Sequence, residues 1–174
     1  MKSKTPWIIL AVVLMIIALF LMITKEPPFK TISFSNKNQV KNLNRVNYLD
    51  TITHIGLKKL NLIGINLVIR DMKEDIKIGE YDVKAFIIGD NSQYAIYTKL
   101  LINRTKSIEV ISHELIHLLQ SEVGKFKKGD TYIIWENDTI HNPGDLDYSK
   151  RPWEIEAFDL GKLLEYEIRN ELIQ

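Results

Sequence analysis

The sequence predicts an α+β domain that follows an N-terminal membrane-spanning helix. Three observations lead to this prediction. An uncharged apolar run fills residues 7–23, short runs rich in β-branched and aromatic residues lie in the middle of the chain, and helical spacing of apolar residues is found on both sides of those runs. Residues 36–174 have the length of one compact domain with a core of its own.

The apolar run from Trp7 to Ile23 predicts a single membrane span. A helix of this length rises about 25 Å, which is near the short end of what crosses a bilayer. No small-x-small cleavage site follows it, so we expect an uncleaved signal anchor over residues 1–24. Residues 25–35, which include Pro27 and Pro28, form the expected linker. The short N-terminal tail favours a cytoplasmic N-terminus, which would place the domain outside the cytoplasm at the cell membrane.

Composition restricts the partners and the metal ligands. With 23 Lys and Arg against 22 Asp and Glu, the formal net charge is +1, and this balance does not indicate a nucleic-acid partner. Lys125, Lys127 and Lys128 are expected in a solvated turn. The chain has no Cys, which excludes disulfides and thiolate ligands, so a metal ion would be held by nitrogen and oxygen atoms.

The spacing of apolar residues predicts the first elements of the domain. Helical spacing predicts a helix over residues 38–60. Runs rich in β-branched and aromatic residues then predict three strands, at residues 65–69, 83–88 and 94–102. The segment Gly89-Asp90-Asn91-Ser92 has the composition of a turn, so the last two strands are expected to form a hairpin.

The C-terminal part predicts two helices with a strand pair between them. Helical spacing covers residues 107–122, with Thr105 or Ser107 as the expected cap. After this helix, residues 131–135 predict a strand that pairs back with residues 138–140 across Glu136-Asn137. Pro152 is placed to begin the final helix, which is expected to run to about Glu171.

The helix at residues 107–122 carries His113-Glu114-Leu115-Ile116-His117, an H-E-x-x-H pattern. Two His four residues apart lie about 40° apart around a helix and one turn apart in height, so both imidazoles can reach one metal ion. Glu114 points to the side of the pair, where it can take a proton from a water at the metal without being a ligand. The apolar residues of this helix form a stripe nearly opposite the two His, which indicates a site rather than a core position.

A catalytic zinc takes three protein ligands, so a third donor is expected. Glu156 is favoured because helical projection puts it inside the apolar stripe of the final helix, where an unpaired carboxylate is costly and a metal would neutralise it. Glu154 projects about 160° away, outside that stripe. His141, in a loop, is the rival imidazole. An ion pair of Glu156 with Arg151, or a capping role, would explain Glu156 without a metal.

The motif, together with Arg151-Pro152-Trp153-Glu154-Ile155-Glu156-Ala157-Phe158 in the final helix, resembles the small zincin-type metallopeptidases of bacteria and their phages. Those with a Glu as third ligand have the gluzincin arrangement. The resemblance implies a zincin-like fold and a membrane-anchored enzyme that hydrolyses peptide bonds in a peptide or protein substrate with zinc-activated water. Zn²⁺ would be held by His113, His117 and Glu156, and Glu114 would be the general base.

The resemblance also implies roles for two other segments. Tyr148-Ser149-Lys150 is similar to the region where the protease domain of anthrax lethal factor carries a Tyr near its Glu ligand, with a spacing that differs by one residue. Tyr148 or His141 would stabilise the oxyanion. In zincins the strand before the motif helix usually binds substrate as an added strand, which would give this role to Ala95 to Ile102.

Two other classes of function remain open. The domain could be a membrane-tethered binding or immunity module that keeps the zincin shape without turnover, although a purely structural zinc has no use for a base such as Glu114. It could also be a structural protein in which the motif binds nothing. The zinc content of the protein distinguishes the structural protein from the peptidase and the binding module. Cleavage of an unstructured protein such as casein distinguishes the peptidase from the binding module.

Overall fold

The computed structural model describes residues 33–34, 43–62, 64–72, 76–78, 81–90, 93–99 and 103–174. The expected membrane span at residues 7–23 lies outside the described residues, as does most of the expected linker. None of the helices in the described part of the chain is long and apolar enough to cross a membrane.

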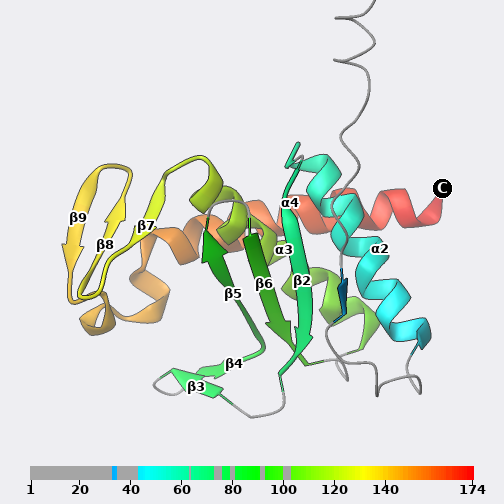
Figure 1. The fold of residues 1–174 in the computed structure, drawn as a ribbon, viewed down its shortest axis with the longest axis horizontal. Helices are drawn as coiled ribbons and strands as arrows, with labels where there is room; N and C mark the ends of the chain where they lie inside the picture. Colours follow the sequence, from blue (N-terminus) through cyan, green and yellow to red (C-terminus); the bar gives the residue numbers. More distant parts are fainter. Residues whose placement is uncertain are drawn as a thin grey trace, which may run out of the picture.

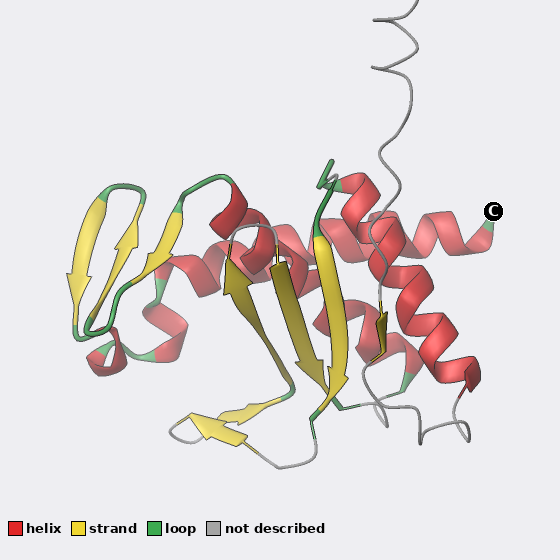
Figure 2. Cartoon of the chain, viewed as in Figure 1, coloured by secondary structure: helices red, strands yellow, loops and turns green. Residues whose placement is uncertain are grey.

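The described chain has the α+β class that the sequence predicts, with three helices and small mixed sheets (Figures 1 and 2). The helices are α2 (Leu43–Lys59), α3 (Arg104–Glu122) and α4 (Pro152–Ile173). The main sheet contains β1 (Ser33–Phe34), β2 (Asn66–Asp71), β5 (Ala85–Asp90) and β6 (Gln93–Thr98). A small hairpin contains β3 (Ile76–Ile78) and β4 (Tyr81–Val83), and a third sheet contains β7 (Phe126–Lys128), β8 (Tyr132–Trp135) and β9 (Asp138–His141). Two 3₁₀ turns, η2 (Pro143–Asp145) and η3 (Tyr148–Lys150), precede α4.

The main sheet has the strand order β1-β2-β6-β5. Strands β1, β2 and β6 are parallel, whereas β5 is antiparallel to β6, and Asp90 lies opposite Gln93 at the end of their hairpin. The predicted hairpin around residues 89–92 is therefore confirmed. Because β6 is paired on both sides, it cannot accept a further strand, and the expectation that the strand beginning at Ala95 binds substrate in this way is wrong. Among the described strands, β5 is the edge strand on this side of the sheet.

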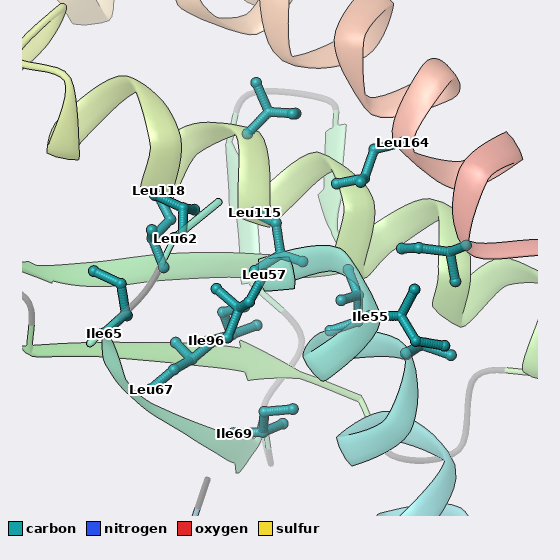
Figure 3. Close-up of a cluster of buried hydrophobic side chains, with 14 of the residues drawn as sticks. Ile55, Leu57, Leu62, Ile65, Leu67, Ile69, Ile96, Leu115, Leu118 and Leu164 are labelled. Carbon is teal, nitrogen blue, oxygen red and sulfur yellow. The ribbon is translucent and has the colours of Figure 1, made fainter. Parts of the chain in front are cut away.

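The core lies between the main sheet and the three helices, and Figure 3 shows its side chains meeting from all of these elements. Fully buried members include Leu67 on β2, Ile96 on β6 and Leu115 on α3. Gly56 lets α2 come close at this point, since a Cβ there would overlap the Leu115 side chain and come 3.3 Å from Cδ1 of Ile168. The motif helix α3 is thus held from both sides, by the sheet and by α2 and α4.

Helix α4 crosses α3 at Gly161. A Cβ at this position would lie 3.4 Å from Cα and 3.5 Å from N of His113, so a larger side chain would not fit between the helices. Glu154 lies about two turns before Gly161 on the same helix. The close crossing therefore brings the first turns of α4 next to the motif residues.

The sheet β7-β8-β9 packs a small second cluster against the start of α4. Ile133, Trp135 and Trp153 are buried there, with Phe126 partly buried against them. The predicted pair β8–β9 is confirmed, and its turn residues Glu136 and Asn137 have φ values of 49° and 80°, as a two-residue hairpin turn requires.

The segment after α3 and the cap of α3 differ from the predictions. Lys127 and Lys128 are exposed as expected, but they belong to strand β7 and not to a turn. The cap of α3 is Asn103, whose side chain accepts a hydrogen bond from the Lys106 N–H at 2.8 Å. The predicted caps Thr105 and Ser107 are wrong, because both lie inside the first turn.

Candidate metal centre

Three side chains from α3 and α4 converge on one point. His113 and His117 turn their Nε2 atoms toward each other at 3.1 Å. Oε2 of Glu154, in the first turn of α4, lies 3.3 Å from Nε2 of His113 and 3.4 Å from Nε2 of His117. In the part of the chain that the structure describes, His113, His117 and Glu154 form a group that can hold a metal ion.

The spacing of these three atoms fits a tetrahedral metal site. Bonds of about 2.0–2.1 Å to N and O ligands at tetrahedral angles put neighbouring ligand atoms about 3.3 Å apart. The three observed separations, 3.1, 3.3 and 3.4 Å, are close to that value. The side chains of the two His are 15% and 16% exposed, so a fourth ligand can reach the site from solvent. Two imidazoles and a carboxylate are donors that suit zinc.

The third member of the group is Glu154, so the expectation for Glu156 has to be corrected. Glu156 accepts a short hydrogen bond from the Lys125 ammonium in an ion pair, and a second bond from Nε2 of Gln120 at 3.1 Å. An ion pair therefore explains Glu156 without a metal, as the sequence allowed, but the partner of Glu156 is Lys125 and not Arg151. His141, the rival imidazole, is the last residue of β9 and is not part of the group.

The error has a physical cause in the rotation of α4. The sequence prediction took the large apolar residues of α4 as its buried face, but two of them, Leu160 and Leu163, are exposed. The buried face of the helix is instead made by Trp153, Glu154, Ala157, Gly161, Leu164 and Ile168. Its closest contact with α3 is made by a glycine, which carries no apolar side chain to mark the face in the sequence.

Glu114 is buried beside the group and is not a member of it. The backbone N–H of Ile87, on edge strand β5, faces Glu114 and lowers the pKa of its carboxyl. Burial raises the pKa of Glu114, and the charge of Glu154 adds to this rise, while His117, His113 and the Ile87 N–H oppose it. A carboxylate whose pKa is raised toward neutrality is a better proton acceptor than an ordinary Glu.

Tyr148, in η3, lies at the site as expected. Its hydroxyl donates a hydrogen bond to Oε2 of Glu154 at 2.5 Å. Burial raises the pKa of Tyr148, and the hydrogen bond to Glu154 raises it further, so the phenol keeps its proton and remains a donor.

The charges of Glu154 and His117 support each other. Burial would raise the pKa of Glu154, but hydrogen bonds with His113, His117 and Tyr148 hold it well below its usual range. Burial would lower the pKa of His117, but Glu154, Glu114 and the hydrogen bond with Gln120 together raise it. Glu154 is therefore a carboxylate at neutral pH, as a metal ligand must be.

Sequence reasoning missed two residues at the site. Gln120 is almost fully buried, and its Oε1 lies 2.8 Å from Nδ1 of His117. The sequence could have indicated Gln120, because a residue three positions after His117 lies on the same face of the helix. The ring centroids of Phe158 and His113 lie 4.7 Å apart. The sequence could have indicated Phe158 as well, because it follows Glu154 by four residues and so lies on the same face of α4.

No protein-family model matches the chain, and no curated protein or solved structure is significantly similar to it. What points to a function is therefore the geometry and chemistry of this site.

Proposed function

We propose that this protein is a zinc-dependent metallopeptidase. The observation that carries the proposal is the tetrahedral spacing of His113, His117 and Glu154, with a buried carboxylate, Glu114, directly after the first His. A site that only stored or bound zinc would not need this second acidic group, whose burial has a cost in stability. Zn²⁺, when bound, supplies a Lewis acid that polarises a carbonyl and lowers the pKa of a water molecule to about 7.

The residues of the chain have separate roles in this proposal. Glu114 takes a proton from the attacking water and passes it to the leaving nitrogen of the peptide bond, and its raised pKa suits both transfers. Tyr148 keeps its hydroxyl proton beside Glu154, and in this proposal it turns that proton from Glu154 to the oxyanion.

Strand β5 is the element that we propose binds the substrate. In an antiparallel pair, the N–H and C=O of one residue point to the same side of the strand. The Ile87 N–H faces Glu114, which indicates that the backbone polar groups of Ile87 point to the open edge of β5 rather than to Ile96 on β6. An extended peptide that adds to this edge would therefore pass next to the general base.

The experiment uses the full chain in detergent micelles, with casein as substrate. We expect about one zinc per chain and cleavage of casein. Glu114→Gln should keep the zinc and lower the rate at least about 100-fold. Glu109→Gln is the matched control, because Glu109 lies on the exposed face of the same helix and pairs with Lys106. Normal turnover by Glu114→Gln would contradict the mechanism. Zinc binding without cleavage by the unaltered chain would favour a binding module.

On sequence grounds we also propose that residues 7–23 anchor the protein in the cell membrane, with the domain outside the cytoplasm. Protease added to spheroplasts should then digest the domain or cut near Pro27. Full protection until the membrane is permeabilised would reverse the orientation. A mature chain that lacks residues 1–23 would show instead that the enzyme is secreted.

A further inference from the structure

Gln120 is a buried amide that joins the metal centre to the start of α4. Only 1% of its surface is exposed. Its Oε1 lies 2.8 Å from Nδ1 of His117, while its Nε2 donates to the Trp153 carbonyl at 2.9 Å and to Oε2 of Glu156 at 3.1 Å. All three polar partners of this side chain are therefore fixed by α3 and α4.

The orientation of the amide follows from the chemistry of its partners. A backbone carbonyl and a carboxylate only accept hydrogen bonds, so both must face the NH₂ group of Gln120. The amide oxygen then has to face His117. An amide oxygen also only accepts, so the hydrogen atom between it and the imidazole must belong to Nδ1 of His117.

We infer that Gln120 is a positioning residue that holds neutral His117 in the tautomer protonated on Nδ1, which leaves the Nε2 lone pair free for the metal ion. The inference rests on the proposed metal site for its function. Nε2 of His117 is the atom that faces Nε2 of His113 and Oε2 of Glu154. The same bond also fixes the rotation of the ring, so His117 is aimed at the metal position before an ion arrives.

His113 lacks this arrangement. Its Nδ1 is buried without a hydrogen-bond partner among the described residues, and its ring contacts Phe158 and the edge of His117. Packing therefore orients His113, whereas a hydrogen bond selects the tautomer of His117. A defect at Gln120 should then affect one of the two imidazoles far more than the other.

The support for Gln120 extends to the β7-β8-β9 sheet through Glu156. Lys125 pairs with Glu156 and also with Oε1 of Glu136 at 2.7 Å, and its ammonium lies 5.1 Å from the centroid of the Trp135 ring. Glu156 is thus held in place as a charged acceptor for Gln120. Glu156 therefore supports the site indirectly, by holding Gln120, which contacts His117.

The test compares tautomers by ¹⁵N NMR of the metal-free full chain in micelles, at a pH where His117 is neutral. In the unaltered chain, His117 should be protonated on Nδ1. Gln120→Leu should give a mixture of both tautomers at His117 and leave the His113 signals nearly unchanged. Zinc affinity, measured by chelator competition, should fall about 10- to 100-fold. Tyr94→Phe is the matched control, because it removes the 2.6 Å hydrogen bond to Glu122 on the same helix, away from the His pair.

A paired exchange separates positioning from packing. Gln120→Glu combined with Glu156→Gln puts a carboxylate acceptor next to Nδ1 of His117 and an amide donor at position 156, so the Nδ1–H tautomer should return. The zinc affinity should return only in part, because the Trp153 carbonyl then faces an acceptor. Gln120→Leu combined with Glu156→Gln should restore neither. The inference is overturned if metal-free His117 is protonated on Nε2 in the unaltered chain, or if Gln120→Leu changes neither tautomer nor affinity. Those results would leave the peptidase proposal intact, whereas failure of the unaltered chain to bind zinc would remove that proposal without changing the tautomer result.

Discussion

Glu154 and Glu156 stand two residues apart on α4, and their surroundings differ in every respect that matters for a metal ligand. Glu154 meets two imidazoles and a phenol and is 10% exposed. Glu156 meets an ammonium and an amide and is 26% exposed. A lysine ammonium already balances the charge of Glu156, whereas the partners of Glu154 are imidazoles and a phenol, and an imidazole can give up its proton when a cation binds. The partners of a carboxylate, more than its burial, therefore distinguish a metal ligand from a structural acid.

The largest expected effect is that of Glu154→Gln on zinc binding. The variant loses one of three ligands, so zinc affinity should fall by more than about 100-fold, beyond the usual effect of an outer partner. Chelator competition measures the change in the purified full chain. If Glu154→Gln binds zinc normally and His141→Ala does not, the third ligand is an imidazole and the assignment made here is wrong.

Glu156→Gln should have a smaller effect. The new amide keeps an oxygen for Gln120 but loses the ion pair with Lys125, so zinc affinity should fall about 10-fold or less. The same competition measurement applies, with Glu165→Gln as a control because Glu165 pairs with Arg169 on the later part of α4. If Glu156→Gln lowers the zinc affinity as much as Glu154→Gln does, the two carboxylates do not have the different roles described above.

The pH dependence of stability gives a third test in the metal-free protein. The folded state lowers the pKa of Glu154, so this carboxylate contributes stability that is fully present above the pKa of an unfolded Glu, about 4.3. That contribution is lost as the pH falls toward the lower pKa of the folded state. Glu154→Gln should thus lower Tm by roughly 5 °C at neutral pH and by less in acid. If the Tm difference between the variant and the unaltered chain is the same at both pH values, the folded state does not lower the pKa of Glu154.

Gly161→Ala should have the smallest effect and should act on Glu154 more than on Glu156. The added methyl would lie 3.4 Å from Cα of His113, a contact that α4 can accommodate by moving a few tenths of an ångström. Zinc affinity should fall only a few-fold, and Gly161→Leu should reduce it much further. Equal affinities for both variants would show that the crossing at Gly161 does not position Glu154.

Local patterns in the sequence predicted most of the elements in their order, but not β1, the β3–β4 hairpin or β7. Apolar spacing located α2, α3 and α4, and the turn residues around Asp90 and Asn137 located the β5–β6 and β8–β9 hairpins. The pair His113 and His117 follows from helix geometry alone, because four residues make about one turn. These features depend on neighbours in the chain, so the sequence contains what is needed to find them.

Features that depend on distant contacts were not predicted. The rotation of α4 depends on Gly161 meeting α3, and a glycine contributes nothing to an apolar stripe. The order of the sheet puts β5, rather than β6, at the edge, although β6 is the strand that directly precedes the motif helix. The cap of α3 is Asn103, two residues before the earliest residue considered. The rotation of α4 and the order of the sheet are thus decided by segments far apart in the sequence, whereas the Asn103 cap is a local contact that apolar spacing did not locate.

Because the Ile87 N–H faces Glu114, the proposed base depends on strand β5 as well as on its own helix. His113, His117 and Glu154 all belong to the C-terminal part of the chain, where the segment with β7, β8 and β9 joins α3 to α4. The surroundings of Glu114 also require β5, whose place in the sheet depends on contacts made earlier in the chain. The three residues that can hold a metal ion therefore come from α3 and α4 alone, whereas the setting of Glu114 depends on the main sheet as well.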